Sequence, residues 1–325
     1  MRVLAGDIGG TNARLAIVEI DATGARLCHT QRFASKDFPG LTPIVQAFLA
    51  EIAEPPDRAC FAIACPILDG KCNGTNLSWT VNVHTLAEEI GIPRTKIIND
   101  LHAVGHGVWR LAPADLVMLQ AGEPNERGTI ALIGAGTGLG EAFVTRNGDA
   151  YQVHSSEGGH ASFGATSERE CGLLTSLAKR FGHVSTERVV SGPGLVSIYR
   201  YLADVGEAQE QARVRHRMEA ADPSAVISDE GLAGTDRLSE RALAMFVSAY
   251  GAQAGNLALT VMATGGVYVA GGIAPRIVPK LRDGTFMTAF RNKGRLSDVL
   301  AHIPVNVIVN PHAGLIGAAM VAMHL

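Results

Sequence analysis

The stretch "GDIGGTNARLAI", from Gly6 to Ile17, raises the question that decides the fold. It places one carboxylate, Asp7, in a glycine-rich turn between the apolar runs "VLA" and "LAIV". One interpretation is a β-hairpin whose turn has no further task. The other is a loop whose backbone N–H groups hold a phosphate, because glycines leave those groups unobstructed. From these residues alone both interpretations stay open.

A second stretch of the same kind lies near the middle of the chain. "TIALIGAGTGLGEAFVTR", residues 129–146, again predicts a strand, a loop rich in Gly and Thr, and a strand. Neither loop fits the Walker pattern, because no lysine follows the glycines, and neither leads into the helix of a dinucleotide fingerprint. Two such hairpins predict two similar domains that face one cleft.

The composition allows a large folded protein and excludes several classes. The chain has 325 residues, of which 47% are hydrophobic and 18% charged, enough for two domains with packed cores. Its net charge is −3 and no basic block occurs, so no nucleic-acid binding is expected. Residues 242–275 carry no charge, but their glycine pairs and Pro275 favour a buried helix and strand over a membrane span.

The cysteines and the N-terminus indicate in which cellular compartment the protein is expected. The five cysteines are irregularly spaced, which predicts neither a disulfide framework nor a zinc site. The apolar part of "MRVLAGD" is too short for a secretory signal. We therefore expect a cytoplasmic protein with reduced thiols.

Strand-like and helix-like segments alternate, which indicates an α/β protein. Strands are predicted at residues 2–8, 13–20, 59–67, 96–100, 129–135, 140–146, 266–273 and 306–310. Helices are predicted at residues 42–53, 83–91 and 242–263. The polar, Ala-rich segment 202–237 predicts surface helices and loops.

Three further segments carry side chains suited to binding. "IIND" places Asn99 and Asp100 at the end of an apolar strand, where α/β proteins hold ligands, although Asp100 could equally be a helix N-cap. "EGGH", residues 157–160, and Glu187 could converge on a polar ligand, or could be a solvated acid and a core histidine. A metal site there has less support, since no cysteine and no second histidine stands at ligand spacing. In "TGGVYVAGGIAP", residues 264–275, glycine could admit a flat ring or serve helix–strand packing.

Eight segments in order resemble the bacterial ATP-dependent glucokinases, a family of the sugar kinase–actin–chaperone superfamily. They are "GDIGGTNARLA", "AIACPI", "TNLSW", "IINDLHAV", "GAGTGLG", "EGGH", "SGPGL" and "GGVYVAGGIAPR". The resemblance runs from Gly6 to Gly317 and is weakest over residues 202–237. A related family of sugar kinases and repressors has a cysteine-rich zinc motif after its Glu-Gly-Gly-His; here only Cys171 follows, so no zinc is expected.

The resemblance implies two ribonuclease H-like, actin-like ATPase domains with mixed sheets flanking a hinged cleft. The small domain would comprise residues 1–110 and a C-terminal helix at about 301–325, and the large domain residues 111–300. The family also implies a homodimer.

The resemblance implies phosphoryl transfer from Mg-ATP to the 6-hydroxyl of D-glucose, giving glucose 6-phosphate and ADP. Asp100 would be the base, and an ordinary aspartate, with a pKa of about 3.9, is a weak one. The sugar would contact Asn99, Asp100, Gly138, Glu157, His160 and Glu187. The nucleotide would contact Asp7, Gly9, Gly10, Thr11, Asn12, Gly136, Thr137, Gly265, Gly266 and Gly271.

Asp7 would orient hydrated Mg²⁺, and Gly138 would also belong to the second phosphate loop. Two alternatives stay open. One is a kinase for another hexose or an amino sugar, or one that uses a different phosphoryl donor. The other, from a different class, is a non-enzymatic sugar sensor of the same fold.

Overall fold

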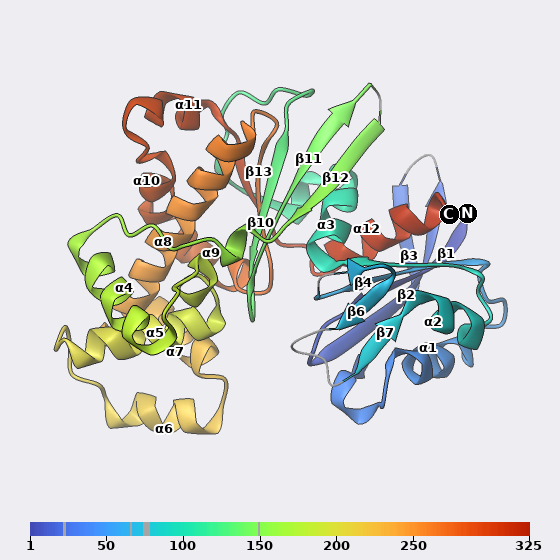
Figure 1. Ribbon diagram of the computed structural model, residues 1–325, viewed down its shortest axis with the longest axis horizontal. Coiled ribbons are helices and arrows are strands. Elements are labelled where there is room, and N and C mark those ends of the chain that lie inside the picture. The colour runs from blue at the N-terminus through green and yellow to red at the C-terminus, as the bar shows by residue number, and fades with distance from the viewer. Residues whose placement is uncertain (22–23, 66, 74–78, 149) are drawn as a thin grey trace. The chain divides into compact units, whose positions relative to one another are not determined.

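A computed structural model describes residues 1–21, 24–65, 67–73, 79–148 and 150–325 (Figure 1). Its internal contacts divide the chain into two compact units. Unit 1 comprises Met1–Asp115, Val153–Ser155 and Asn310–Leu325, and unit 2 comprises Leu116–Gln152 and Ser156–Val309. Each unit is built on one large mixed sheet.

The large sheet of unit 1 has five strands in the order β3-β2-β1-β4-β8. Their bounds are β1 Arg2–Ile8, β2 Asn12–Asp21, β3 Gly24–Ala34, β4 Arg58–Ile63 and β8 Arg94–Asn99. The first three strands form an antiparallel meander, whereas β1, β4 and β8 run parallel. The predicted hairpin is present, since Ile8 pairs with Ala13 across the first glycine turn.

Both faces of this sheet are covered, which explains why β1 is apolar along nearly its whole length. Its side chains alternate between faces: Val3 lies in one core cluster with Leu315, and Leu4 lies in another with Phe48. The described helices of the unit are α1 Leu41–Leu49, α2 Val83–Ile90, α3 Asp100–Gly107 and α12 Ala313–Met323. Of these, α12, drawn in red in Figure 1, carries Leu315, and α1 carries Phe48.

Helices α3 and α12 touch backbone to backbone through glycine. A Cβ at Gly317 would lie 1.6 Å from the carbonyl oxygen of Ala103, and one at Gly107 would lie 3.0 Å from the Gly317 nitrogen. Side chains at these positions would hold the helices apart. The contact therefore sets the height of α3 above the sheet, and α3 begins with Asp100.

A small three-stranded sheet, β5-β6-β7, extends unit 1. Its strands are β5 Ile67–Leu68, β6 Lys71–Asn73 and β7 Thr80–Asn82. The single strand predicted over residues 59–67 is therefore two strands, because β4 ends at Ile63. Pro66 of "AIACPI" and residues 75–78 of "TNLSW" lie outside the described residues.

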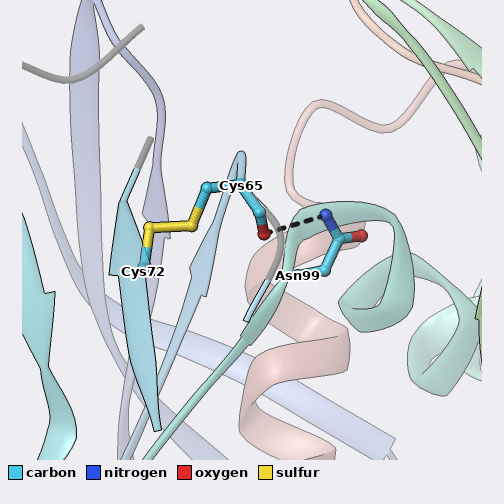
Figure 2. Close-up of a disulfide and its surroundings, with 3 residues drawn as sticks. All are labelled: Cys65, Cys72 and Asn99. Atoms are coloured by element: carbon cyan, nitrogen blue, oxygen red, sulfur yellow. Dashed lines mark hydrogen bonds between the residues drawn. A yellow bond between two sulfur atoms is a disulfide. The ribbon is translucent and has the colours of Figure 1, made fainter. Parts of the chain in front are cut away.

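The β5–β6 hairpin brings two cysteines together, which was not expected from their spacing. Figure 2 shows Cys65 and Cys72 joined by a disulfide, with their Cα atoms 6.1 Å apart. Ile67 pairs with Cys72 in the hairpin, so the chain returns to Cys65 within seven residues. The expectation that every thiol is free is therefore wrong at this pair.

Unit 2 contains a six-stranded sheet in the order β12-β11-β10-β13-β14-β9. The bounds are β9 Leu116–Gln120, β10 Ile130–Ala135, β11 Leu139–Asn147, β12 Ala150–Ser156, β13 Gly266–Ala270 and β14 Val305–Ile308. Its first five strands repeat the arrangement of unit 1: β10 and β11 form an antiparallel hairpin, and β13 and β14 run parallel to β10. This repetition agrees with the duplicated hairpin in the sequence.

The long helix α8 forms the centre of the unit 2 core. The described helices here are α4 Glu168–Phe181, α5 Gly192–Asp204, α6 Ala212–Ala220, α7 Pro223–Ala233, α8 Arg237–Val261, α9 Val278–Leu281, α10 Thr285–Arg291 and α11 Ser297–His302. Within the predicted surface segment 202–237, α7 is not a surface helix, because its Val226 and Ile227 are buried in the core. Among the described helices, none combines the length and apolar character needed to cross a membrane.

We predict that Gly317→Ala lowers the free energy of unfolding by about 1–3 kcal/mol, because the added methyl group must push α12 away from α3. Gly314→Ala is the control on the same helix, since a Cβ there meets its nearest atom at an ordinary 3.5 Å. Chemical denaturation of both variants checks this. Equal stability of the two variants would contradict the backbone contact.

Candidate active site

The turn between β1 and β2 leaves backbone donors free. Gly9 donates its N–H to the carbonyl of Asn12 at 2.9 Å, and Ser35 closes the turn by donating its hydroxyl to the Gly9 carbonyl at 2.8 Å. Within the described residues, the N–H groups of Gly10 and Thr11 donate to no protein acceptor. Both residues are exposed. The turn thus offers two unobstructed donors to an anion such as phosphate.

Asp7 stands directly before this turn, at the carboxyl end of β1. Burial raises the pKa of its carboxyl group, and the charges of Arg14 and His312 oppose that shift. The Arg14 guanidinium approaches the carboxylate only to 3.9 Å. The carboxylate oxygens of Asp7 are therefore not held in a close ion pair and can act as ligands.

Asn99, rather than Asp100, caps helix α3. Its side-chain oxygen accepts from the backbone N–H groups of Leu101 and His102 at 3.0 and 3.2 Å. Its amide nitrogen donates to the Cys65 carbonyl at 3.4 Å, the contact drawn in Figure 2. Asp100 is the first helical residue, so the interpretation of Asp100 as the N-cap is corrected.

Asp100 is held in surroundings that make it a stronger base than an ordinary aspartate. Burial raises its pKa to about 6, helped by the negative charge of Asp7 and opposed by the hydrogen bond from the Leu101 N–H. That bond, 2.8 Å long, fixes one carboxylate oxygen. The sequence-based expectation of a pKa near 3.9 underestimated the base.

The second glycine loop, between β10 and β11, resembles the first in its use of hydrogen bonds. Gly136 donates to the carbonyl of Gly138 at 2.8 Å, while the N–H groups of Thr137 and Gly138 donate to no acceptor in the described protein. Glu187 accepts the N–H of Leu139 at 2.9 Å. A Cβ at Gly138 would lie 2.5 Å from a carboxylate oxygen of Glu187, so a side chain there would displace that carboxylate.

The structure brings Glu157, His160 and Glu187 together within unit 2. The two ring nitrogens of His160 lie 3.8 Å from Glu157 and 4.0 Å from Glu187. The side chains of Glu157 and His160 are mostly exposed, and 29% of Glu187 is exposed. Two carboxylates and an imidazole facing solvent are well suited to accept and donate hydrogen bonds to a polyhydroxylated ligand.

The predicted nucleotide glycines divide between the two ends of β13. Gly271 follows its carboxyl end, where a Cβ would lie 2.4 Å from the carbonyl oxygen of Ala135, next to the Gly136 loop. Gly265 and Gly266 lie at the amino end, beside Thr129 and Ile130. The structure therefore joins Gly271 to the loop and does not join Gly265 or Gly266 to it.

Sequence reasoning missed two residues beneath the "EGGH" turn. Glu141 on β11 is buried, and its carboxylate accepts a 2.7 Å hydrogen bond from Gln253 of α8. The only signal was a single acid in the apolar strand "GEAFV".

Among the described residues, no group of three or more His, Cys, Asp and Glu side chains is arranged to hold a metal ion.

Comparison with known proteins gives a consistent result. A family model described as Glucokinase matches residues 4–325. The glucokinase of a Nostoc species is 46% identical over 99% of both chains, and that of a Synechocystis species is 42% identical over 98% of this chain and 97% of its own.

Solved structures agree with this assignment. The crystal structure of a glucokinase from an Antarctic psychrotroph is 33% identical, covers 100% of this chain and 99% of its own, and superposes with a TM-score of 0.85. A ROK family glucokinase from Streptomyces griseus, solved with glucose and AMPPNP, is 21% identical with full coverage of both chains and a TM-score of 0.69, which supports the fold. The expected actin-like ATPase fold with mixed sheets is thereby confirmed, and the chain belongs to the glucokinase family.

Proposed function

We propose that the protein transfers the γ-phosphoryl group of Mg-ATP to the 6-hydroxyl of D-glucose, forming glucose 6-phosphate and ADP. Membership of the glucokinase family supports the reaction. The observation that carries the residue assignment is Asp100, a carboxylate with a pKa of about 6 beside the first glycine turn. We also propose that the enzyme is a homodimer, on the resemblance alone, and that it is cytoplasmic, on the short apolar run at its N-terminus and the absence of a disulfide framework in its cysteine spacing.

Asp100 is the proposed general base. Its raised pKa lies close to neutral pH, where a base is both ionised and able to accept a proton. One oxygen is held by the Leu101 N–H, which leaves the other to bind the 6-hydroxyl. Because Asn99 caps the helix, the carboxylate of Asp100 is not needed for capping and can serve the substrate.

The proposed phosphate contacts are the donors that the protein itself does not use. They are the N–H groups of Gly10 and Thr11 in unit 1 and of Thr137 and Gly138 in unit 2. Gly9, Asn12 and Gly136 hold the shapes of the two turns, and Gly271 lines the second. Gly265 and Gly266 take no direct part in this proposal, because they lie at the other end of β13.

Asp7 is the proposed partner of Mg²⁺, through water. Mg²⁺ keeps several waters and is bound by one or two carboxylates together with substrate phosphates, which fits a carboxylate that Arg14 approaches only to 3.9 Å, beside a phosphate turn. When bound, the ion would neutralise charge on the transferring phosphate. Asp7 itself would orient the hydrated ion and would not contact the sugar.

The sugar is proposed to bind Asn99 and Asp100 in unit 1 and Gly138, Glu157, His160 and Glu187 in unit 2. Sites that hydrogen-bond a substrate hydroxyl reject analogues that lack it, since the polar groups are then left unpaired. The three unit 2 side chains should therefore set the choice among hexoses.

A coupled assay with ATP across a hexose panel tests the function. We expect glucose to be phosphorylated with kcat/KM at least about tenfold above that of mannose, galactose or N-acetylglucosamine. Higher activity with an amino sugar would favour the alternative kinase. Binding of glucose without any turnover would favour a sensor.

Replacing the base separates catalysis from stability. Asp100→Asn should lower kcat by about 10²–10⁴-fold while the affinity for glucose changes less than about tenfold. It should also raise the melting temperature at pH 7, because the fold favours the uncharged carboxyl group and ionisation above pH 6 costs stability. Normal turnover by this variant would exclude Asp100 as the base.

The pH dependence of the wild-type enzyme follows from the same group. Because the base must be ionised, kcat/KM for glucose, which reports the free enzyme, should rise with pH through an apparent pKa of about 6 and level off above it. Initial rates at glucose concentrations well below KM, measured from pH 5 to 8, follow this rise. A rate that is flat from pH 5 upward would contradict the assignment.

Asp7→Ala should impair use of Mg-ATP more than glucose binding. We expect kcat/KM for Mg-ATP to fall by at least about tenfold, because the hydrated ion loses its orienting group. The glucose dissociation constant, measured by calorimetry without nucleotide, should change less than threefold. A larger change in glucose affinity than in Mg-ATP use would overturn this role.

A further inference from the structure

We propose that Glu141 and Gln253 form a positioning pair that holds the turn containing Glu157 and His160, and so controls affinity for the sugar. The inference rests on the proposed function, in which that turn binds the sugar. Both residues lie in unit 2, 112 residues apart in sequence. Neither is assigned contact with a substrate.

The pair is a directed hydrogen bond between a buried acid and a half-buried amide. The side-chain amide of Gln253, on α8, donates to one oxygen of Glu141 at 2.7 Å. Asn256, one turn further along α8, donates to the Gln253 oxygen at 3.2 Å and so fixes the amide orientation. Only 5% of Glu141 is exposed. Gln253 therefore presents its amide donor to this carboxylate in a fixed orientation.

The other oxygen of Glu141 supports the turn from below. A Cβ at Gly158 would lie 2.1 Å from that oxygen, which means that the carboxylate rests against the Gly158 backbone. Two residues earlier on the same strand, the Leu139 carbonyl lies against Gly159, where a Cβ would approach it to 2.1 Å. The turn is thus seated on β11 at both glycines.

A buried carboxylate at Glu141 lowers the stability of the fold, which indicates that it has a functional role. Glu141 forms no ion pair with any residue that the structure describes, and its donor is a neutral amide. A buried carboxylate without a cationic partner is unfavourable compared with an apolar side chain of similar volume. Its burial also raises its pKa. Filling space between α8 and β11 would not require a charge.

Hydrogen bonds along the turn transmit a displacement of Gly158 to the side chains that are proposed to bind the sugar. Ser156 accepts the Gly158 N–H at 3.0 Å, and the Glu157 carbonyl accepts the His160 N–H at 2.9 Å. A shift of Gly158 therefore displaces Glu157 and His160 together. A displaced acceptor no longer lies within hydrogen-bond distance of the sugar hydroxyl, so such a shift should weaken sugar binding.

The test compares stability with the separate KM values for glucose and ATP. Glu141→Leu should raise the glucose KM at least tenfold, leave the ATP KM within twofold and leave the melting temperature unchanged or higher. Glu230→Gln is the matched control: it alters another buried acid of unit 2, paired with Arg213, Arg217 and Thr235, and should lower stability without moving the glucose KM. An unchanged glucose KM in Glu141→Leu, or parallel rises of both KM values with loss of stability, would overturn the proposal.

Exchanging the partners gives a second test that does not depend on the first variant folding. Gln253→Glu places two carboxylates face to face and should raise the glucose KM at least tenfold. The double variant Glu141→Gln with Gln253→Glu restores an amide–carboxylate pair and should return the glucose KM to within threefold of wild type. Absence of that rescue would overturn the pair. Failure of the proposed function would appear separately, as inactivity of the wild-type chain on every hexose.

Discussion

The site in unit 1 depends on one constraint: parallel strands β1, β4 and β8 end at the same edge of the sheet. Asp7 lies at the end of β1, and Asn99 and Asp100 lie at the end of β8. Their proximity is evident in the charge of Asp7, which adds to the effect of burial in raising the pKa of Asp100. Two like charges in partly buried surroundings destabilise the fold.

In unit 2 the acids Glu157 and Glu187 are held in place by a rigid support. The support consists of close contacts at glycine. Gly159 meets the backbone of Leu139, Gly271 meets the backbone of Ala135, and Gly138 meets the side chain of Glu187. Side chains at Gly159 or Gly271 would separate the turns from the strands, and one at Gly138 would displace Glu187, so the glycines fix the relative positions of the donors and the acids. Strand ends and short turns give more precise sites than long loops.

The sequence predicted the two hairpins, the α/β class and most strands, because these follow from local periodicity and glycine turns. It could not decide between Asn99 and Asp100 as the cap, because both residue types cap helices well and the choice depends on the backbone. It grouped Gly265 and Gly266 with Gly271, although a strand separates them. The Glu141–Gln253 bond and the Cys65–Cys72 pair were missed because they depend on how α8 and a hairpin pack.

The central claim is that the fold prepares Asp100 as a base. The most direct measurement is an NMR titration of aspartate carboxyl carbons in the substrate-free protein, with the Asp100 signal identified by its absence in Asp100→Asn. The account predicts a midpoint of about 6. A midpoint at the ordinary aspartate value of about 3.9 would contradict it.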